Sequence, residues 1–278
     1  MKKFILSCIL FLLIACPAIT IIPVFLDLTG TYKYTVAGTE IYHSIFKSKQ
    51  KKKSRKIVIG DSVGKQLFSN DTYNDSINSL ACNKGISMAG QFILLNNYLN
   101  AGNKVDTVFL IFTPFSFLTN LNDVYTYHYF LKPFYIDEYK PMFTKLVIDQ
   151  IYKVPYYKFC RFPNILTSNW APDFISKDKI DYTFLSPISV EYLIKIKELS
   201  RKNNFKLIIL PTPTRLSRKT EVERMVKNEI TKSNMDAEFK NYFENILYVN
   251  DKEFIDDVHL KKEKLAYYTA YYKNRLMK

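Results

Sequence analysis

The chain has 278 residues, which is enough for one full hydrophobic core with appended segments and needs no disulfide or metal staples. A formal net charge of +14 favours an anionic partner, such as acidic lipid, an acidic polymer or nucleic acid. Nucleic acid is unsupported, because the sequence has no zinc-finger spacing, RNA-recognition signature or basic-region heptads. Only three histidines occur, which argues against a multi-histidine metal site, and we expect no metal or cofactor.

The N-terminus begins Met-Lys-Lys and continues as an uncharged apolar stretch over residues 4–26. Crossing a bilayer takes about 20 apolar residues, and a cleaved signal peptide usually has a shorter apolar core. We therefore expect residues 1–30 to form a transmembrane anchor or an uncleaved signal. This would place the protein in a bacterial inner or plasma membrane as a single-pass protein, with its body on the periplasmic or extracellular side. A lipobox ending at Cys16, with Cys16 as the lipidated residue, is the other interpretation.

Residues 31–55 are predicted to be a basic linker, and residues 56–278 to be one folded domain. The lysine-rich run KSKQKKKSRK, residues 47–56, is typical of a solvated segment that lies near anionic headgroups or an anionic polymer.

Residues 56–68 read KIVIGDSVGKQLF and are the stretch around which the rest is organised. The apolar β-branched run predicts a buried strand, and Gly60-Asp61-Ser62 predicts a turn into a helix over residues 62–70. Ser62 would then stand at the carboxyl end of a strand, the edge at which open α/β sheets bind ligands. It could serve there as a nucleophile, or it could simply cap the helix.

The following segments alternate between strand and helix patterns. We expect strands over residues 77–82 and 105–112, with a helix over residues 85–100 between them. This β-α-β-α-β rhythm favours a three-layer α/β/α sandwich with a mostly parallel, flavodoxin-like sheet.

Residues 113–187 interrupt the rhythm. They are rich in aromatic residues and contain the only tryptophan, Trp170. A segment of this length is predicted to be either a lid or substrate wall, or a helical insertion over one edge of the sheet.

Regular patterns return in the last third of the chain. We expect helices over residues 189–201, 221–233 and 261–276, strands over residues 205–210 and 246–249, and a rigid loop over residues 211–215. Arg215 stands at a strand's carboxyl end, where it could contact an anionic or carbonyl group of a substrate, or remain solvated. The body cysteines, Cys82 and Cys160, have no metal-ligand spacing and are expected to be free thiols, although an oxidising compartment would permit a disulfide.

Asp256 and His259 follow the last expected strand. A nucleophilic serine needs a base within hydrogen-bond reach and a third group that fixes the tautomer of the base. In a parallel sheet His259 would lie at the same edge as Ser62, and Asp256 could reach its ring. The alternative is that Asp256 caps the last helix and His259 is an ordinary surface residue.

The GDS motif at residues 60–62, paired with D-x-x-H at residues 256–259, resembles the SGNH (GDSL-type) hydrolase superfamily, and more narrowly its membrane-anchored bacterial members. The resemblance covers about residues 56–278. It implies that Ser62 is the nucleophile, His259 the general base and acid, and Asp256 the orienting carboxylate.

The two middle blocks of this family match less well. The resemblance implies that the backbone amides of Ser62 and Gly85, or those near Ser87 and Met88, form the oxyanion hole. The family's Gly-x-Asn-Asp block is replaced by Thr113-Pro-Phe-Ser116. Asn120 or Asn122 could supply the missing donor, whose loss typically costs about two to three orders of magnitude in rate.

These features predict a membrane-tethered serine esterase or O-acyltransferase, with acetyl as the expected acyl group, acting on cell-envelope carbohydrate. The expected partners are an acylated carbohydrate or another ester, and a membrane held through the N-terminal helix. The alternative is a non-catalytic binding or assembly protein of the cell envelope that keeps the fold.

Overall fold

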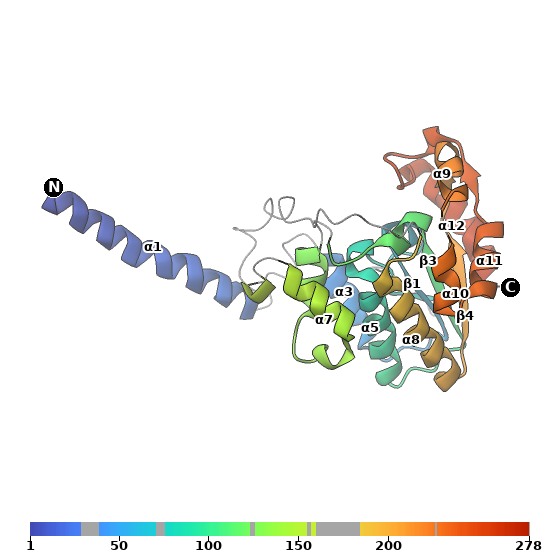
Figure 1. The fold of residues 1–278 in the computed structure, drawn as a ribbon, viewed down its shortest axis with the longest axis horizontal. Helices are drawn as coiled ribbons and strands as arrows, with labels where there is room; N and C mark the ends of the chain where they lie inside the picture. The colour runs from blue at the N-terminus through green and yellow to red at the C-terminus, as the bar shows by residue number, and fades with distance from the viewer. Residues whose placement is uncertain are drawn as a thin grey trace.

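A computed structural model describes residues 1–28, 39–70, 76–122, 126–154, 157–159, 184–225 and 227–277 (Figure 1). Cys160 and Trp170 lie outside the described residues, as does most of the second half of the predicted insertion.

Four parallel strands form the central sheet, in the order β2-β1-β3-β4. They are β1 (Lys56–Gly60), β2 (Asn78–Ser79), β3 (Thr107–Phe112) and β4 (Lys206–Pro211). The prediction of an α/β fold with a mostly parallel sheet is confirmed. The chain adds β2 on one side of β1 and then β3 on the other side. The carboxyl ends of β1 and β3 therefore form a topological switch point, which is where ligands bind in such sheets.

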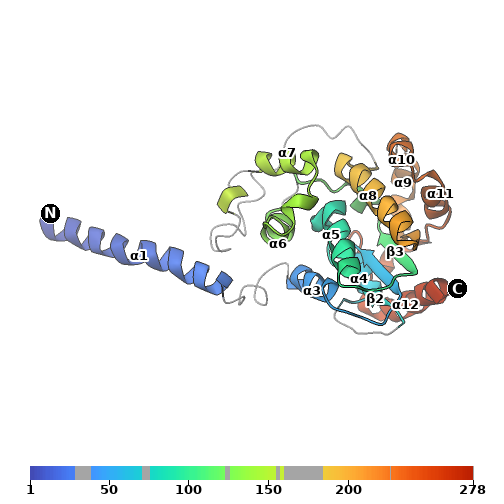
Figure 2. The ribbon, with the colours of Figure 1, turned by 90° about the horizontal axis from the view of Figure 1, so that it is seen from below.

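Helices pack against both faces of the sheet (Figures 1 and 2). Along β1, Ile57 and Ile59 point into one core and Val58 into the other, as the two-residue period of a strand requires. The first core is built with α3 (Thr39–Ser48), α5 (Ser87–Asn100) and α8 (Pro187–Asn203). The second is built with α4 (Ser62–Leu67) and α12 (Lys262–Met277).

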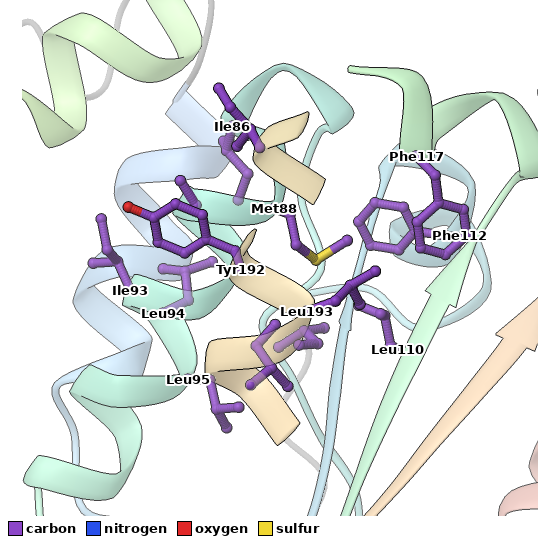
Figure 3. Close-up of a cluster of buried hydrophobic side chains, with 14 of the residues drawn as sticks. Ile86, Met88, Ile93, Leu94, Leu95, Leu110, Phe112, Phe117, Tyr192 and Leu193 are labelled. Atoms are coloured by element: carbon purple, nitrogen blue, oxygen red, sulfur yellow. The ribbon is translucent and has the colours of Figure 1, made fainter. Parts of the chain in front are cut away.

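Figure 3 shows part of the first core, where Leu110 and Phe112 of β3 meet Met88 of α5 and Leu193 of α8. These side chains are almost completely excluded from solvent, so their burial is a main stabilising term of the fold.

Beyond β4 the chain departs from the expected pattern. The expected loop contains a short strand, β5 (Thr214–Arg215), which pairs in parallel with β6 (Tyr248–Val249) as a separate sheet. The single helix expected at residues 221–233 is two helices, α9 (Lys219–Glu223) and α10 (Asn228–Ser233), and α11 (Asp236–Glu244) follows them.

Part of the predicted linker is structured instead. The helix α3 buries Ile41, Ser44 and Lys47, and the Nζ of Lys47 donates a hydrogen bond of 3.0 Å to the carbonyl of Asn70. The lysine-rich run therefore is not uniformly solvated. Composition predicts that such charges lie at the surface, whereas in the fold a backbone carbonyl compensates the buried ammonium group of Lys47.

The described part of the insertion is helical. It comprises α6 (Lys132–Phe134), α7 (Lys145–Lys153) and the short turns Pro114–Leu118, Thr126–Leu131, Lys140–Met142 and Tyr157–Phe159. Several of its aromatic side chains join the first core: Phe117, Phe130, Phe134, Tyr139 and Phe143. The helical-insertion interpretation is therefore favoured for these residues, because aromatics buried in a core cannot form a substrate wall.

The N-terminal helix α1 (Lys2–Leu28) precedes the α/β body. Within the described ranges, no helix combines the length and the apolar character that crossing a bilayer requires. This finding contradicts the predicted transmembrane anchor over residues 1–30 and the predicted single-pass membrane localisation. The prediction rests on the length of residues 4–26 and on their lack of charged side chains.

Candidate active site

The turn that carries Ser62 is held by the neighbouring aspartate. Asp61 is the N-cap of α4, and its Oδ1 accepts hydrogen bonds from the amides of Val63 (3.0 Å) and Gly64 (2.9 Å). Asp61 therefore does the capping that was one interpretation of Ser62. The Ser62 hydroxyl is left for another partner.

Two glycines bring α4 close to β3. A Cβ atom at Gly60 would lie 2.5 Å from the carbonyl oxygen of Ile111, and one at Gly64 would lie 2.7 Å from the same atom. Neither position has room for a side chain. This close approach places the first turn of α4 at the carboxyl edge of the sheet.

Ser62, His259 and Asp256 form a continuous hydrogen-bonded chain. The Oγ of Ser62 lies 2.8 Å from Nε2 of His259, and Nδ1 of His259 lies 2.8 Å from Oδ2 of Asp256. The other carboxylate oxygen of Asp256 accepts the amides of Val258 (2.9 Å) and His259 (2.8 Å). The three residues that the sequence singled out are thus brought together in the order nucleophile, base and orienting carboxylate.

No protein-family model, curated protein or solved structure matches this chain. The functional conclusion therefore rests on the residues and their geometry.

Hydrogen bonding keeps the carboxylate of Asp256 ionised. Partial desolvation acts to raise the pKa of Asp256, but the hydrogen bonds from the His259 and Val258 amides, together with the contact to the His259 ring, outweigh it, and the pKa is lowered. The carboxylate therefore stays ionised at neutral pH and can accept the Nδ1 proton of His259. That bond fixes the tautomer in which Nε2 faces Ser62 as an acceptor.

Of the backbone amides expected to form an oxyanion hole, that of Ser62 lies at a helix start, whereas those of Gly85 and Ser87 already have acceptors. Ser62 is the first residue of α4, where a helix leaves its backbone amides without intrahelical partners, so its N–H can face a reacting carbonyl. The amide of Gly85 instead donates to Oδ1 of Asn83 at 2.8 Å. Gly85, which the resemblance implied as a donor, is therefore already engaged in this structure. The amide of Ser87, which was also considered, donates to the carbonyl of Lys84.

The segment Thr113–Ser116 supports Asp61. Oδ2 of Asp61 accepts the amide of Thr113 (2.8 Å) and the hydroxyl of Ser116 (2.6 Å), and Ser116 Oγ lies 2.8 Å from Thr113 Oγ1. Since the Ser116 proton goes to the carboxylate, the Thr113 hydroxyl donates to Ser116. Both hydroxyl protons are used, so neither residue has one to spare for an oxyanion.

Asn120 and Asn122 were the other candidates for that role. Asn120 is buried, and its Oδ1 has no hydrogen-bond partner among the described residues. Within the part of the chain that the structure describes, neither asparagine hydrogen-bonds Ser62, Asp256 or His259.

Arg215 supports the loop that carries the base. Its guanidinium lies 3.1 Å from Oδ1 of Asp257 and 3.2 Å from Oδ2 of Asp251. The side-chain and backbone hydrogen bonds of Ser217 lower the pKa of Asp251, and the charge of Arg215 adds to this effect. Arg215 is therefore engaged in ion pairs with Asp251 and Asp257, and its contact with a substrate stays a prediction.

The sequence did not indicate that Gln91 holds the end of β1, just before Ser62. The buried side chain of Gln91 bonds both backbone groups of Gly60: the Gly60 amide donates to Oε1 at 3.2 Å, and Nε2 donates to the Gly60 carbonyl at 2.9 Å. No local pattern marks this role, since a glutamine inside a helix is ordinary. Within the described ranges, no group of three or more His, Cys, Asp or Glu side chains could hold a metal ion.

Proposed function

We propose that this chain is an SGNH-type serine esterase or O-acyltransferase that forms an acyl-enzyme on Ser62. The observation that carries the proposal is the unbroken chain of two 2.8 Å contacts from Ser62 through His259 to Asp256. The strand order β2-β1-β3-β4, with helices on both faces, supports the finer assignment to a flavodoxin-like three-layer sandwich.

Acylation begins when the Ser62 oxygen attacks the ester carbonyl carbon and its proton passes to Nε2 of His259. Asp256 stabilises the imidazolium that forms. The carbonyl oxygen becomes an oxyanion, toward which the Ser62 amide can donate. When the carbon–oxygen bond to the leaving group breaks, the leaving alkoxide takes the proton from Nε2, and an acyl-Ser62 ester remains.

Deacylation runs through the same groups. A water molecule or an acceptor hydroxyl loses its proton to His259 and attacks the acyl carbon. The Ser62 oxygen leaves and recovers the proton from Nε2. Attack by water makes the protein an esterase, and attack by a sugar hydroxyl makes it an O-acyltransferase.

We propose an acetylated carbohydrate as the substrate, in line with the family resemblance. The side chains of His259 and Asp256 are partly exposed, which suits an ester carried on a bulky or polymeric molecule. The net charge of +14 favours a carbohydrate that carries acidic groups.

The test uses the full chain, a fluorophosphonate probe and p-nitrophenyl acetate. We expect covalent labelling and acetate release by the wild-type protein, and loss of both in Ser62→Ala. A matched control is Ser200→Ala, because Ser200 lies near the end of α8 that precedes β4, and its hydroxyl bonds only a helix carbonyl. Labelling that persists in Ser62→Ala would refute the nucleophile.

A binding or assembly protein with the same fold is the second candidate. It is favoured by one observation: Thr113 and Ser116 use their hydroxyl protons within the Asp61 network, so the third family block supplies no oxyanion donor from these side chains. A wild-type protein that is folded yet reacts with neither reagent would support this candidate and exclude the enzyme.

A further inference from the structure

Gln66 is placed to connect the nucleophile and the base. It lies on α4 four residues after Ser62, so both side chains leave the same face of the helix. Its carboxamide bonds both backbone groups of Leu260, the residue that follows His259. The Leu260 amide donates to Oε1 at 3.1 Å, and Nε2 donates to the Leu260 carbonyl at 3.4 Å.

The loop that carries His259 is shaped largely by its own hydrogen bonds. The amide of Ile255 donates to the carbonyl of His259 (2.9 Å), and the amide of Lys261 donates to the carbonyl of Glu253 (2.8 Å). Between these bonds, Phe254 and Leu260 form an antiparallel β-bridge. These bonds join residues of the same loop. They fix its shape and leave its distance from Ser62 to be set by contacts with the rest of the protein.

Several contacts connect this loop to the body. Arg215 and Arg218 pair with Asp257, Tyr268 of α12 donates to Glu253, and Phe254 and Leu260 pack in the second core. Gln66 holds the Leu260 backbone from α4. Among the described residues, Gln66 is the α4 side chain, besides Ser62 itself, that hydrogen-bonds the loop. Its two bonds tie the residue next to His259 to the helix that carries Ser62.

We propose that Gln66 is a positioning residue that sets the distance between Ser62 and His259 by clamping the Leu260 backbone to α4. This inference rests on the function proposed above. A displacement of about 1 Å between reacting groups can cost about 10²-fold in rate, and a bidentate amide resists both sliding and tilting of the loop. This distance governs proton transfer from Ser62 to His259, so we expect the effect to fall mainly on kcat.

The test compares Gln66→Met, which keeps the length of the side chain and the helix propensity, with Gln66→Glu, which keeps an acceptor for the Leu260 amide. We expect kcat to fall about 10- to 100-fold in Gln66→Met with KM changed by less than about 3-fold. Gln66→Glu should recover a large part of kcat. The neighbouring Lys65→Met controls for the introduction of a methionine on α4, and circular dichroism checks the fold of each variant.

A kcat of Gln66→Met equal to that of Lys65→Met would overturn the clamp while leaving the proposed function standing. If the wild-type protein shows no activity, the ring ¹H–¹⁵N signals of His259 test the clamp independently. We expect these signals to shift from their wild-type positions in Gln66→Met, in the direction seen in Ser62→Ala. Signals of Gln66→Met that superimpose on those of the wild type would overturn it.

Discussion

The carboxylate of Asp61 stabilises the turn that carries Ser62 through four hydrogen bonds, and Asp61→Asn tests how much they stabilise the fold. The side chain is 1 % exposed, and each of its oxygens accepts two donors. Asparagine has nearly the same shape but only one acceptor oxygen. The substitution therefore changes hydrogen bonding without creating a cavity.

The magnitude follows from the less costly orientation of the new amide. Its oxygen would keep the amides of Val63 and Gly64, and its NH₂ would face Thr113 and Ser116. The Ser116 hydroxyl can turn and accept, but the Thr113 amide is left without an acceptor, which costs about 1–3 kcal/mol. The bonds that remain lose their charge assistance, worth about 1 kcal/mol more. We expect the free energy of unfolding to fall by about 2–4 kcal/mol.

Urea denaturation followed by circular dichroism measures this change. The control is Ser116→Ala, alone and combined with Asp61→Asn, because residues in one hydrogen-bond network couple by about 0.5–3 kcal/mol. A loss below about 1 kcal/mol in Asp61→Asn, or strictly additive effects in the double variant, would refute the reasoning.

Three further predictions use the same protein. Gly64→Ala should lower the free energy of unfolding by about 1–3 kcal/mol in urea, although alanine favours a helix, because its Cβ would meet the Ile111 carbonyl; equal or greater stability would contradict the packing. Since the pKa of Asp256 is lowered on folding, the folded state gains stability from it above its usual pKa of 3.8 and loses that gain as the pH falls through the lower folded value. Asp256→Asn should therefore cost stability at pH 6 and progressively less below about pH 4 in the same titrations. Burial raises the pKa of the Cys82 thiol to about 12, so iodoacetamide at pH 8 should modify it, by peptide mass spectrometry, only after urea is added; labelling of the folded chain would contradict its burial.

The strands and most of the helices around them could be predicted because their signal is local. The β-branched run that ends at Gly60 and the apolar run that ends at Phe112 form β1 and β3 close to the expected limits. The predictions failed where tertiary contacts override local character. In α3, Lys47 is buried against a backbone carbonyl that comes from another segment, and composition alone cannot reveal such a partner.

The residues of the candidate site could be predicted from the sequence, but the hydrogen-bond and ion-pair partners around them could not. Ser62, Asp256 and His259 could be selected because their side chains suit one reaction. The partners of Gly85 and Arg215 could not be predicted, since Asn83, Asp251 and Asp257 reach them only in the folded chain. A donor or a cation that looks available in a sequence can already be engaged in the structure.

The sequence by itself determined the parallel α/β pattern and put a serine at the end of its first strand. Only the tertiary structure decided that Asp61 caps α4, that the Thr113–Ser116 segment supports this cap, and that Gln66 hydrogen-bonds the backbone of Leu260, next to His259. The reason is physical. Periodicity and turn chemistry act over a few neighbouring residues, whereas a hydrogen bond such as that between Gln66 and Leu260, 194 residues apart, exists only once the sheet has brought its carboxyl ends together.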